Sequence, residues 1–173
     1  MDEALQLAIE MSEQNWMNFQ NNLKDLSSDE IQWRPLPQAN NINAILKHLR
    51  VTEEWYVAGI EYGEQSPYHD AASLEQLTAA VPLDFEQNLK DLEGLHHRFV
   101  AAVRSTTLAA LRQHTFLSQA MPGQSPQPAH TLLLREMMHL AMHRGQIRTI
   151  RNLYRTTRGE PGLFLPDNPL FAE

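Results

Sequence analysis

The sequence predicts an all-α protein folded as a four-helix bundle, and three observations support this fold class. Four long segments carry apolar residues at the three- and four-residue spacing of an amphipathic helix. No segment shows a persuasive alternation of apolar and polar residues of the kind that is typical of β-strands. Stretches rich in proline, glycine or polar residues separate the four segments and have the composition of loops. Helices of this kind bury their apolar faces together in a bundle.

The first helix is expected over residues 2–26. Its apolar residues recur at helical spacing and form the predicted inner face: Leu5, Ile9, Trp16, Phe19 and Leu23. The connection that follows, SSDEIQWRPLPQANN, is polar and contains Pro35 and Pro37. Because proline lacks a backbone N–H and restricts the residue before it, no continuous helix passes through this connection.

The second helix is expected over residues 42–62, INAILKHLRVTEEWYVAGIEY, with Asn40 or Asn41 as its N-cap. Its predicted inner residues follow the helical repeat: Ile42, Ile45, Leu49, Tyr56 and Ile60. Residues 63–70, GEQSPYHD, form a loop.

The third long helix is expected to extend to about Ser105 and to follow a short helical stretch, SLEQLTAA, capped by Ser73. Pro82 either kinks this short stretch or opens the long helix at its first position. The predicted stripe of the long helix is apolar: Phe85, Leu89, Leu92, Leu95, Phe99 and Val103. A second short helix, TLAALRQ, follows it. The long connection between the second and third helices permits a non-sequential arrangement in the bundle.

The fourth helix is expected to begin near His130 or Thr131, after the loop MPGQSPQPAH, and to end by Gly159. Its inner stripe is apolar: Leu133, Leu140, Ile147 and Ile150. The tail that follows, EPGLFLPDNPLFAE, is rich in proline and apolar residues, so it is expected to lie as an extended strap over the bundle. Residues 1–173 together suit one domain with a sizeable core.

Composition excludes several classes of function. The formal net charge of −7 argues against a sequence-independent nucleic-acid-binding protein. No apolar run approaches the roughly 20 residues that span a bilayer, and the acidic, amphipathic start lacks the features of a secretory signal, so a cytoplasmic location is expected. The chain has no cysteine, which excludes disulfides, thiolate metal sites and cysteine nucleophiles. Any metal must therefore be bound by His, Asp or Glu.

His139 and His143 lie one helical turn apart in the segment LLLREMMHLAMHRGQIRTIRNLY, on its apolar stripe. Side chains at this spacing are close enough to bind one metal ion. His48 lies on the inner side of the second helix and is the candidate third ligand. Three neutral imidazoles with an open position are typical of a catalytic metal centre. Spacing alone leaves open the alternative that these are buried, hydrogen-bonded histidines.

Two other metal sites do not fit the pattern. Leu140 occupies the position at which a zinc protease of the HExxH type carries glutamate. The motif Glu136-x-x-His139 occurs once, whereas a di-iron site in a bundle requires two such motifs and two more glutamates. The remaining histidines are predicted to lie on the surface or in loops: His69, His96, His97, His114 and His130. No Ser/His/Asp triad and no phosphate-binding glycine loop can be identified.

The segments HLAMHRGQIRTIRNLY and WRPLPQANNINAILKHLRVTEEWY resemble the last-helix and second-helix signatures of the DinB/YfiT-like superfamily of metal-binding four-helix bundles. The resemblance extends from the first helix to about Tyr154 and is most specific in the last helix. It implies that His48, His139 and His143 are the metal ligands. It also implies a divalent cation, most often zinc or nickel, with water completing the coordination. The proline-rich tail is less typical of the superfamily.

Other polar residues near these histidines have predicted supporting roles. A metal-bound histidine usually donates its second nitrogen to a carboxylate or carbonyl. Glu136 shares the ligand face and is the preferred partner, ahead of Glu53 and Glu54, and Gln146 is placed to hydrogen-bond a ligand or a substrate. A row of arginines along the last helix is interpreted as a solvated helix face, with an anion site as the alternative: Arg144, Arg148, Arg151, Arg155 and Arg158.

The resemblance implies a metal-dependent transferase that uses a low-molecular-weight thiol such as bacillithiol, mycothiol or glutathione, in detoxification or stress response. The metal would stabilise the thiolate, which attacks an electrophile. Hydrolysis by a metal-activated water is the alternative reaction. Two alternatives lie outside catalysis. One is a non-enzymatic metal-binding protein, in which the metal links two helices or signals stress. The other is a binding or assembly module whose contact surface is the arginine face or the apolar tail, and whether the protein is an enzyme stays open. The superfamily makes a homodimer plausible, and a small-molecule substrate is the expected partner.

Overall fold

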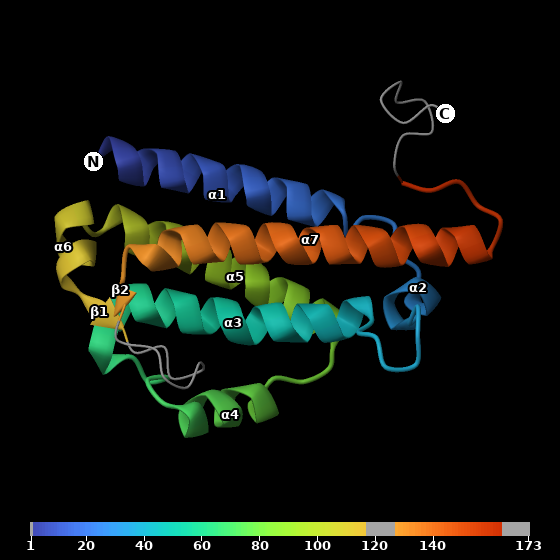
Figure 1. The fold of residues 1–173 in the computed structure, drawn as a ribbon, viewed down its shortest axis with the longest axis horizontal. Coiled ribbons are helices and arrows are strands. Elements are labelled where there is room, and N and C mark those ends of the chain that lie inside the picture. Colours follow the sequence, from blue (N-terminus) through green and yellow to red (C-terminus); the bar gives the residue numbers. More distant parts are fainter. Residues whose placement is uncertain (1, 117–126, 164–173) are drawn as a thin grey trace.

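The computed structural model describes residues 2–116 and 127–163 and confirms the all-α fold class. Four long helices pack side by side as a bundle (Figure 1). Their bounds are α1 (Glu3–Asn21), α3 (Ile42–Tyr62), α5 (Phe85–Arg104) and α7 (Thr131–Thr157). The helices α3 and α7, which carry the predicted metal ligands, are neighbours in the bundle.

The order of the helices around the bundle is not their order in the sequence. Helices α1 and α7 run in one direction, and α3 and α5 run in the other (Figure 1). Helix α3 packs against α5 and α7, and α1 packs against α7 and α5. The parallel neighbours α3 and α5 are joined by a crossover that contains a 3-10 turn, η1 (Gly63–Gln65), and the helix α4 (Ala71–Ala80). The long connection therefore makes the non-sequential arrangement that its length permits.

Helix α3 has the bounds that the sequence predicts, and its N-cap is Asn41, whose side chain accepts a hydrogen bond from Ala44 N (2.8 Å). Gly59 on α3 allows α7 to approach closely, because a Cβ at this position would lie 2.6 Å from Cδ1 of Leu132. The absence of a side chain there thus leaves room for the Leu132 side chain between the two helices that carry the histidines.

Two predicted boundaries before α3 are wrong. Helix α1 ends at Asn21 rather than near residue 26. The predicted connection contains a short helix, α2 (Ser28–Gln32), in which the Ser27 side chain accepts a hydrogen bond from Glu30 N (3.2 Å). Five residues are too few to show a helical repeat in the sequence, although a serine followed by acidic residues is a recognisable helix start.

The start of α4 and the start of α5 also differ from the predictions. Asp70 rather than Ser73 is the N-cap of α4, and Ser73 is the reciprocal partner in a capping box. Helix α5 begins at Phe85 with Asp84 as its N-cap, so Pro82 precedes the helix and neither kinks nor opens it. In both helices an aspartate side chain accepts a hydrogen bond from a backbone N–H of the first turn, which has no partner within the helix.

A two-stranded antiparallel ladder interrupts the helical chain, contrary to the expectation of no strands. It pairs β1 (Thr115–Phe116) with β2 (Gln127–Pro128) and follows the predicted short helix, α6 (Leu108–Gln113). Strands of two residues are too short to show alternation in the sequence. The predicted strap falls mainly on residues 164–173, which lie outside the described residues.

The predicted inner faces are buried, apart from Phe85 and Leu89, which are half-buried at one end of the core. Met138 and Met142 are exposed on α7, at 71% and 53%. None of the helices within the described part of the chain is long and apolar enough to cross a membrane.

Candidate metal centre

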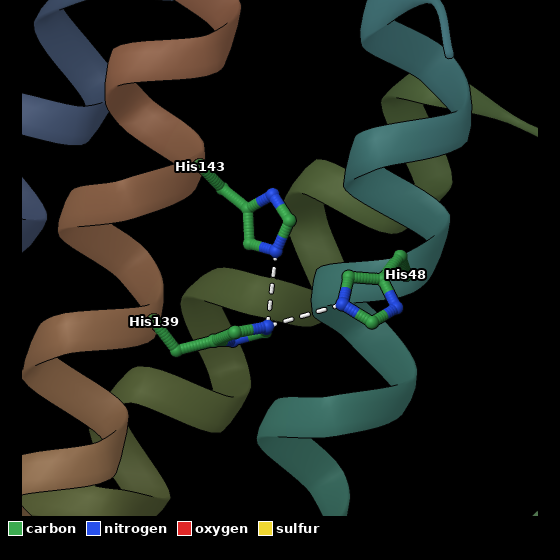
Figure 2. Close-up of side chains that lie close together, drawn as sticks. All are labelled: His48, His139 and His143. Atoms are coloured by element: carbon green, nitrogen blue, oxygen red, sulfur yellow. Dashed lines mark hydrogen bonds between the residues drawn. The ribbon is translucent and has the colours of Figure 1, made fainter. Parts of the chain in front are cut away.

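The three predicted ligands meet in the seam between α3 and α7 (Figure 2). His139 and His143 project from successive turns of α7, and His48 projects toward them from α3. The Nε2 atom of His139 lies 3.0 Å from Nε2 of His48 and 3.0 Å from Nε2 of His143. The candidate ligand atoms of all three residues lie within 4.8 Å of one another.

The orientation of two of the rings is fixed by acceptors at their other nitrogen. Nδ1 of His143 lies 2.7 Å from Oε1 of Gln146, and Nδ1 of His139 lies 3.3 Å from Oε1 of Glu53. A neutral imidazole that donates its Nδ1–H to such an oxygen carries a lone pair on Nε2. In this tautomer the Nε2 atoms of His139 and His143 both carry lone pairs, so neither can donate a hydrogen bond to the other although they lie 3.0 Å apart.

This arrangement of donors fits a metal ion. Zinc–nitrogen bonds of about 2.0–2.1 Å in a tetrahedral site place two nitrogens about 3.3 Å apart. The 3.0 Å separations in the cluster are close to that value. A cation between the three Nε2 atoms would replace the repulsion of lone pairs by three ligand bonds. Three protein ligands leave a further coordination position for water or substrate.

The three histidines differ in their exposure to solvent. His143 is buried, His139 is half-buried and His48 is exposed. The side of the cluster next to His48 therefore faces solvent, while the side next to α7 is enclosed by the bundle.

Burial keeps the ligand imidazoles neutral at physiological pH. It lowers the pKa of His139 to about 4. Burial, with a smaller contribution from His139, lowers the pKa of His143 to about 4 and also lowers the pKa of His48. Because a metal ligand must be deprotonated, these lowered pKa values favour the binding form of the cluster at neutral pH.

Two buried carboxyl groups lie beside the cluster. Burial raises the pKa of Glu53 to about 8, and burial together with Glu53 raises the pKa of Glu136 well above its usual range. Both oxygens of Glu136 accept from the Ser12 hydroxyl at 3.2 Å. No arginine or lysine within the described residues forms an ion pair with Glu53 or Glu136. A divalent cation at the histidines would supply the positive charge that an ionised Glu53 lacks.

The carboxylate that contacts a ligand histidine is thus Glu53 and not Glu136, the preferred partner in the sequence analysis. Glu54, the neighbour of Glu53, points away from the cluster and forms ion pairs with Arg50 (3.1 Å) and Arg98 (3.0 Å). Adjacent residues point to different sides of a helix, so only Glu53 faces α7, and this is decided by how α3 packs against α7. Gln146 contacts a ligand histidine, as the sequence suggested.

The predicted surface location is wrong for one of the remaining histidines. His96 is buried on α5, only 8% exposed, and stacks on Trp16 with ring centroids 5.1 Å apart. His69, His97 and His114 are exposed, as predicted for surface and loop residues, and His130 is half-buried. None of these five joins the metal-ligating group that the described residues contain.

The arginine row of α7 mostly binds groups of the protein itself, so it is not simply a solvated face. Arg151 is buried and donates to Glu30 (2.7 Å) and to the Asn22 carbonyl (2.7 Å). Arg148 donates to the carbonyl of Leu163, and Arg155 to the carbonyl of Pro161. These contacts hold the segment after α7 against the helix.

Comparison with known proteins identifies one family. Residues 11–147 match the DinB superfamily, a range that includes all three clustered histidines and both residues that orient them. No curated protein and no solved structure matches the chain.

Proposed function

The chain belongs to the DinB superfamily, and we propose that it binds one divalent cation through His48, His139 and His143. The observation that carries this proposal is the convergence of three Nε2 atoms, two of them on rings whose Nδ1 is already engaged by Glu53 or Gln146. The buried carboxyl of Glu53 supports it. Among the described residues it contacts His139 but no arginine or lysine, so a cation beside His139 would offset the charge of the carboxylate.

Zinc and nickel are the proposed ions. Neutral imidazole is a good ligand for both, whereas magnesium and calcium prefer oxygen ligands. The chain has no cysteine, so the ligand set contains no thiolate from the protein itself. A thiolate at the centre would have to come from a small molecule.

We propose further that the protein is a transferase for a low-molecular-weight thiol. A divalent cation at the three histidines would lower the pKa of a bound thiol and stabilise it as the thiolate. The thiol proton would leave to solvent on the exposed His48 side. The sulfur would then bond to an electrophilic carbon, and the leaving group would depart with its electron pair. Glu53 and Gln146 hold the ligand rings in place during this change, since each accepts a hydrogen bond from an Nδ1.

The exposure of His48 favours this reading over a purely structural metal. A structural site usually has four protein ligands and is closed, whereas three histidines are the whole metal-ligating group that the described residues bring together here. The bundle also has two clusters of buried apolar residues, and both include residues of α3 and α7, so it does not depend on a metal link between these helices.

Turnover of a model electrophile such as 1-chloro-2,4-dinitrobenzene with a panel of thiols tests the transferase proposal. The metal-loaded protein should transfer at least one thiol, and removal of the metal with a chelator should abolish turnover. Re-addition of zinc or nickel should restore it. Absence of metal-dependent turnover with every thiol would contradict the transferase proposal, and hydrolysis of model esters by the same samples would favour the hydrolase alternative.

A further inference from the structure

A pocket of about 460 Å³ lies in the same seam as the three histidines. Its walls come from the first turn of α3, from the second half of α7 and from the loop before α3. Ile45 lines it from α3, Gln146 and Thr149 from α7, and Ala39 from the loop. The pocket therefore lies between the two helices that carry the candidate metal ligands.

Helical geometry places this pocket about one helical turn from the cluster. Ile45 precedes His48 by three residues on α3, and Gln146 follows His143 by three residues on α7. Because α3 and α7 run in opposite directions, both steps lead the same way along the bundle (Figure 1). One helical turn is about 5.4 Å. Gln146 joins the two sites physically, since it lines the pocket and its Oε1 lies 2.7 Å from Nδ1 of His143.

The residues that line the pocket are uncharged. The apolar part comes from side chains such as Pro35, Ile45 and Ile150, and the polar part from the amides of Asn40 and Gln146 and the hydroxyl of Thr149. No acidic or basic side chain lines the pocket among the described residues. A carboxylate or phosphate placed here would gain no cationic partner from the lining residues, and Arg34, which contacts the loop wall, already donates to the carbonyl of Ala39.

The cationic residues of α7 line a different pocket. Arg144, Arg148 and Arg151 face a separate hollow of about 420 Å³ between α1 and α7, together with asparagines of α1. The same helix thus presents its arginines toward α1 and its uncharged residues toward α3. An anionic group would be stabilised on the α1 side, whereas the pocket beside the histidines suits a neutral one.

We propose that the pocket beside His143 binds the uncharged body of the thiol, a part bearing amide or hydroxyl groups, while the sulfur is held at the three histidines. This inference rests on the proposed thiol transfer and adds the substrate class. The body must extend about one helical turn from the sulfur, roughly 5 Å. Asn40, Gln146 and Thr149 supply hydrogen-bonding groups, and Ile45 and Ile150 supply apolar contact.

Gly145 allows the pocket to be filled without disturbance of the fold. A Cβ at this position would meet no heavy atom within 4 Å, and the residue lies in a helix interior, where a side chain raises helix propensity. Gly94 on α5 is a matched control, because it is also helical and a Cβ there would also meet nothing within 4 Å. Gly145→Leu and Gly94→Leu therefore add the same side chain at two open helical positions, one inside the pocket and one outside it.

The test measures thiol binding rather than turnover. The protein is loaded with Co²⁺, and thiolate binding is followed by its absorption bands, with affinities expressed per thiolate. N-acetylcysteine amide and N-acetylcysteine differ by one carboxylate, and 2-mercaptoethanol is too small to fill the pocket. The neutral amide should bind the wild-type protein at least about tenfold more tightly than the carboxylate, a difference of about 1.4 kcal/mol.

Gly145→Leu should weaken binding of the amide by about tenfold or more and leave binding of 2-mercaptoethanol within about twofold, while Gly94→Leu should change neither. Metal content confirms that each variant retains the site, and Thr149→Leu provides a second variant that narrows the pocket. Equal affinity for the two N-acetylcysteine derivatives, or no effect of either pocket variant, would overturn this inference and leave thiol binding at the metal intact. If no thiol binds the wild-type protein, the proposed transfer reaction fails and the inference fails with it.

Discussion

The α3–α7 seam and the α1–α5 seam both bury histidine side chains, yet they place them differently. In the α3–α7 seam, His139 and His143 each have an oxygen at Nδ1, and their Nε2 atoms converge with that of His48. In the α1–α5 seam, His96 stacks on Trp16, and its buried Nδ1 has no hydrogen-bond partner within the described residues. Burial is therefore common to both seams, and orientation is what differs.

Burial has the same effect on protonation in both places. It lowers the pKa of His96 to about 4, as it does for His139 and His143. A low pKa alone therefore does not distinguish a candidate ligand from a packed ring. What distinguishes them is an acceptor that fixes the tautomer and directs the other nitrogen toward neighbouring lone pairs.

Removal of one converging ring gives the largest expected difference between the two seams. His143→Ala should lower metal affinity by more than about 100-fold, since loss of a residue that merely orients a ligand already costs up to that factor. His96→Ala should retain the full metal content, because its ring takes no part in the cluster. Elemental analysis after dialysis against a competing chelator measures both. Equal metal content in the wild-type protein and His143→Ala would refute the three-histidine site.

Removal of the charge that orients His139 gives the next effect. Glu53→Gln should lower metal affinity by about 10–100-fold. The amide oxygen can still accept from Nδ1, but it no longer offsets the charge of the cation. Glu136→Gln is the control, because its carboxyl contacts Ser12 and no ligand histidine. Competition titration with a chromophoric chelator measures both affinities, and a larger loss in Glu136→Gln would show that the roles of the two glutamates are reversed.

The smallest effect concerns stability in the α1–α5 seam. As pH falls below 6.5 the histidine of the unfolded chain gains a proton, whereas folded His96 stays neutral down to about pH 4. The unfolded state then binds more protons, so His96 lowers the free energy of unfolding as pH falls through this window. His96→Leu should remove this loss, so its stability relative to the wild-type protein should improve by about 1 kcal/mol between pH 6.5 and 5.5. Urea denaturation at several pH values measures the difference, and a pH-independent difference would contradict the assigned pKa.

The division between burial and orientation also separates what could be predicted from the sequence from what could not. The long helices are predictable because each carries its own apolar repeat and its own caps, such as Asn41 before α3. The helix α2 and the β1–β2 ladder are too short to carry a repeat, so local pattern misses them. The histidines at positions 139 and 143 are predictable as a pair because one helix fixes their spacing.

The partners of those histidines are not predictable in the same way. Glu136 shares the helix and the face of His139, yet the carboxylate at Nδ1 is Glu53 from α3. Which of two adjacent glutamates, Glu53 or Glu54, enters the seam depends on the rotation of α3 against α7. His96 is adjacent to His97, and only the packing of α5 against α1 decides that His96 is buried and His97 exposed.

The sequence by itself determined the helices, the apolar faces and the candidate ligands, because these depend on residue spacing within single segments. The tertiary structure decided which groups meet across helices. It brought His48 to His139, supplied Glu53 as the acceptor, and separated the uncharged pocket on one side of α7 from the arginines on the other. These contacts depend on helix order, rotation and close approach in the bundle, which no single segment contains.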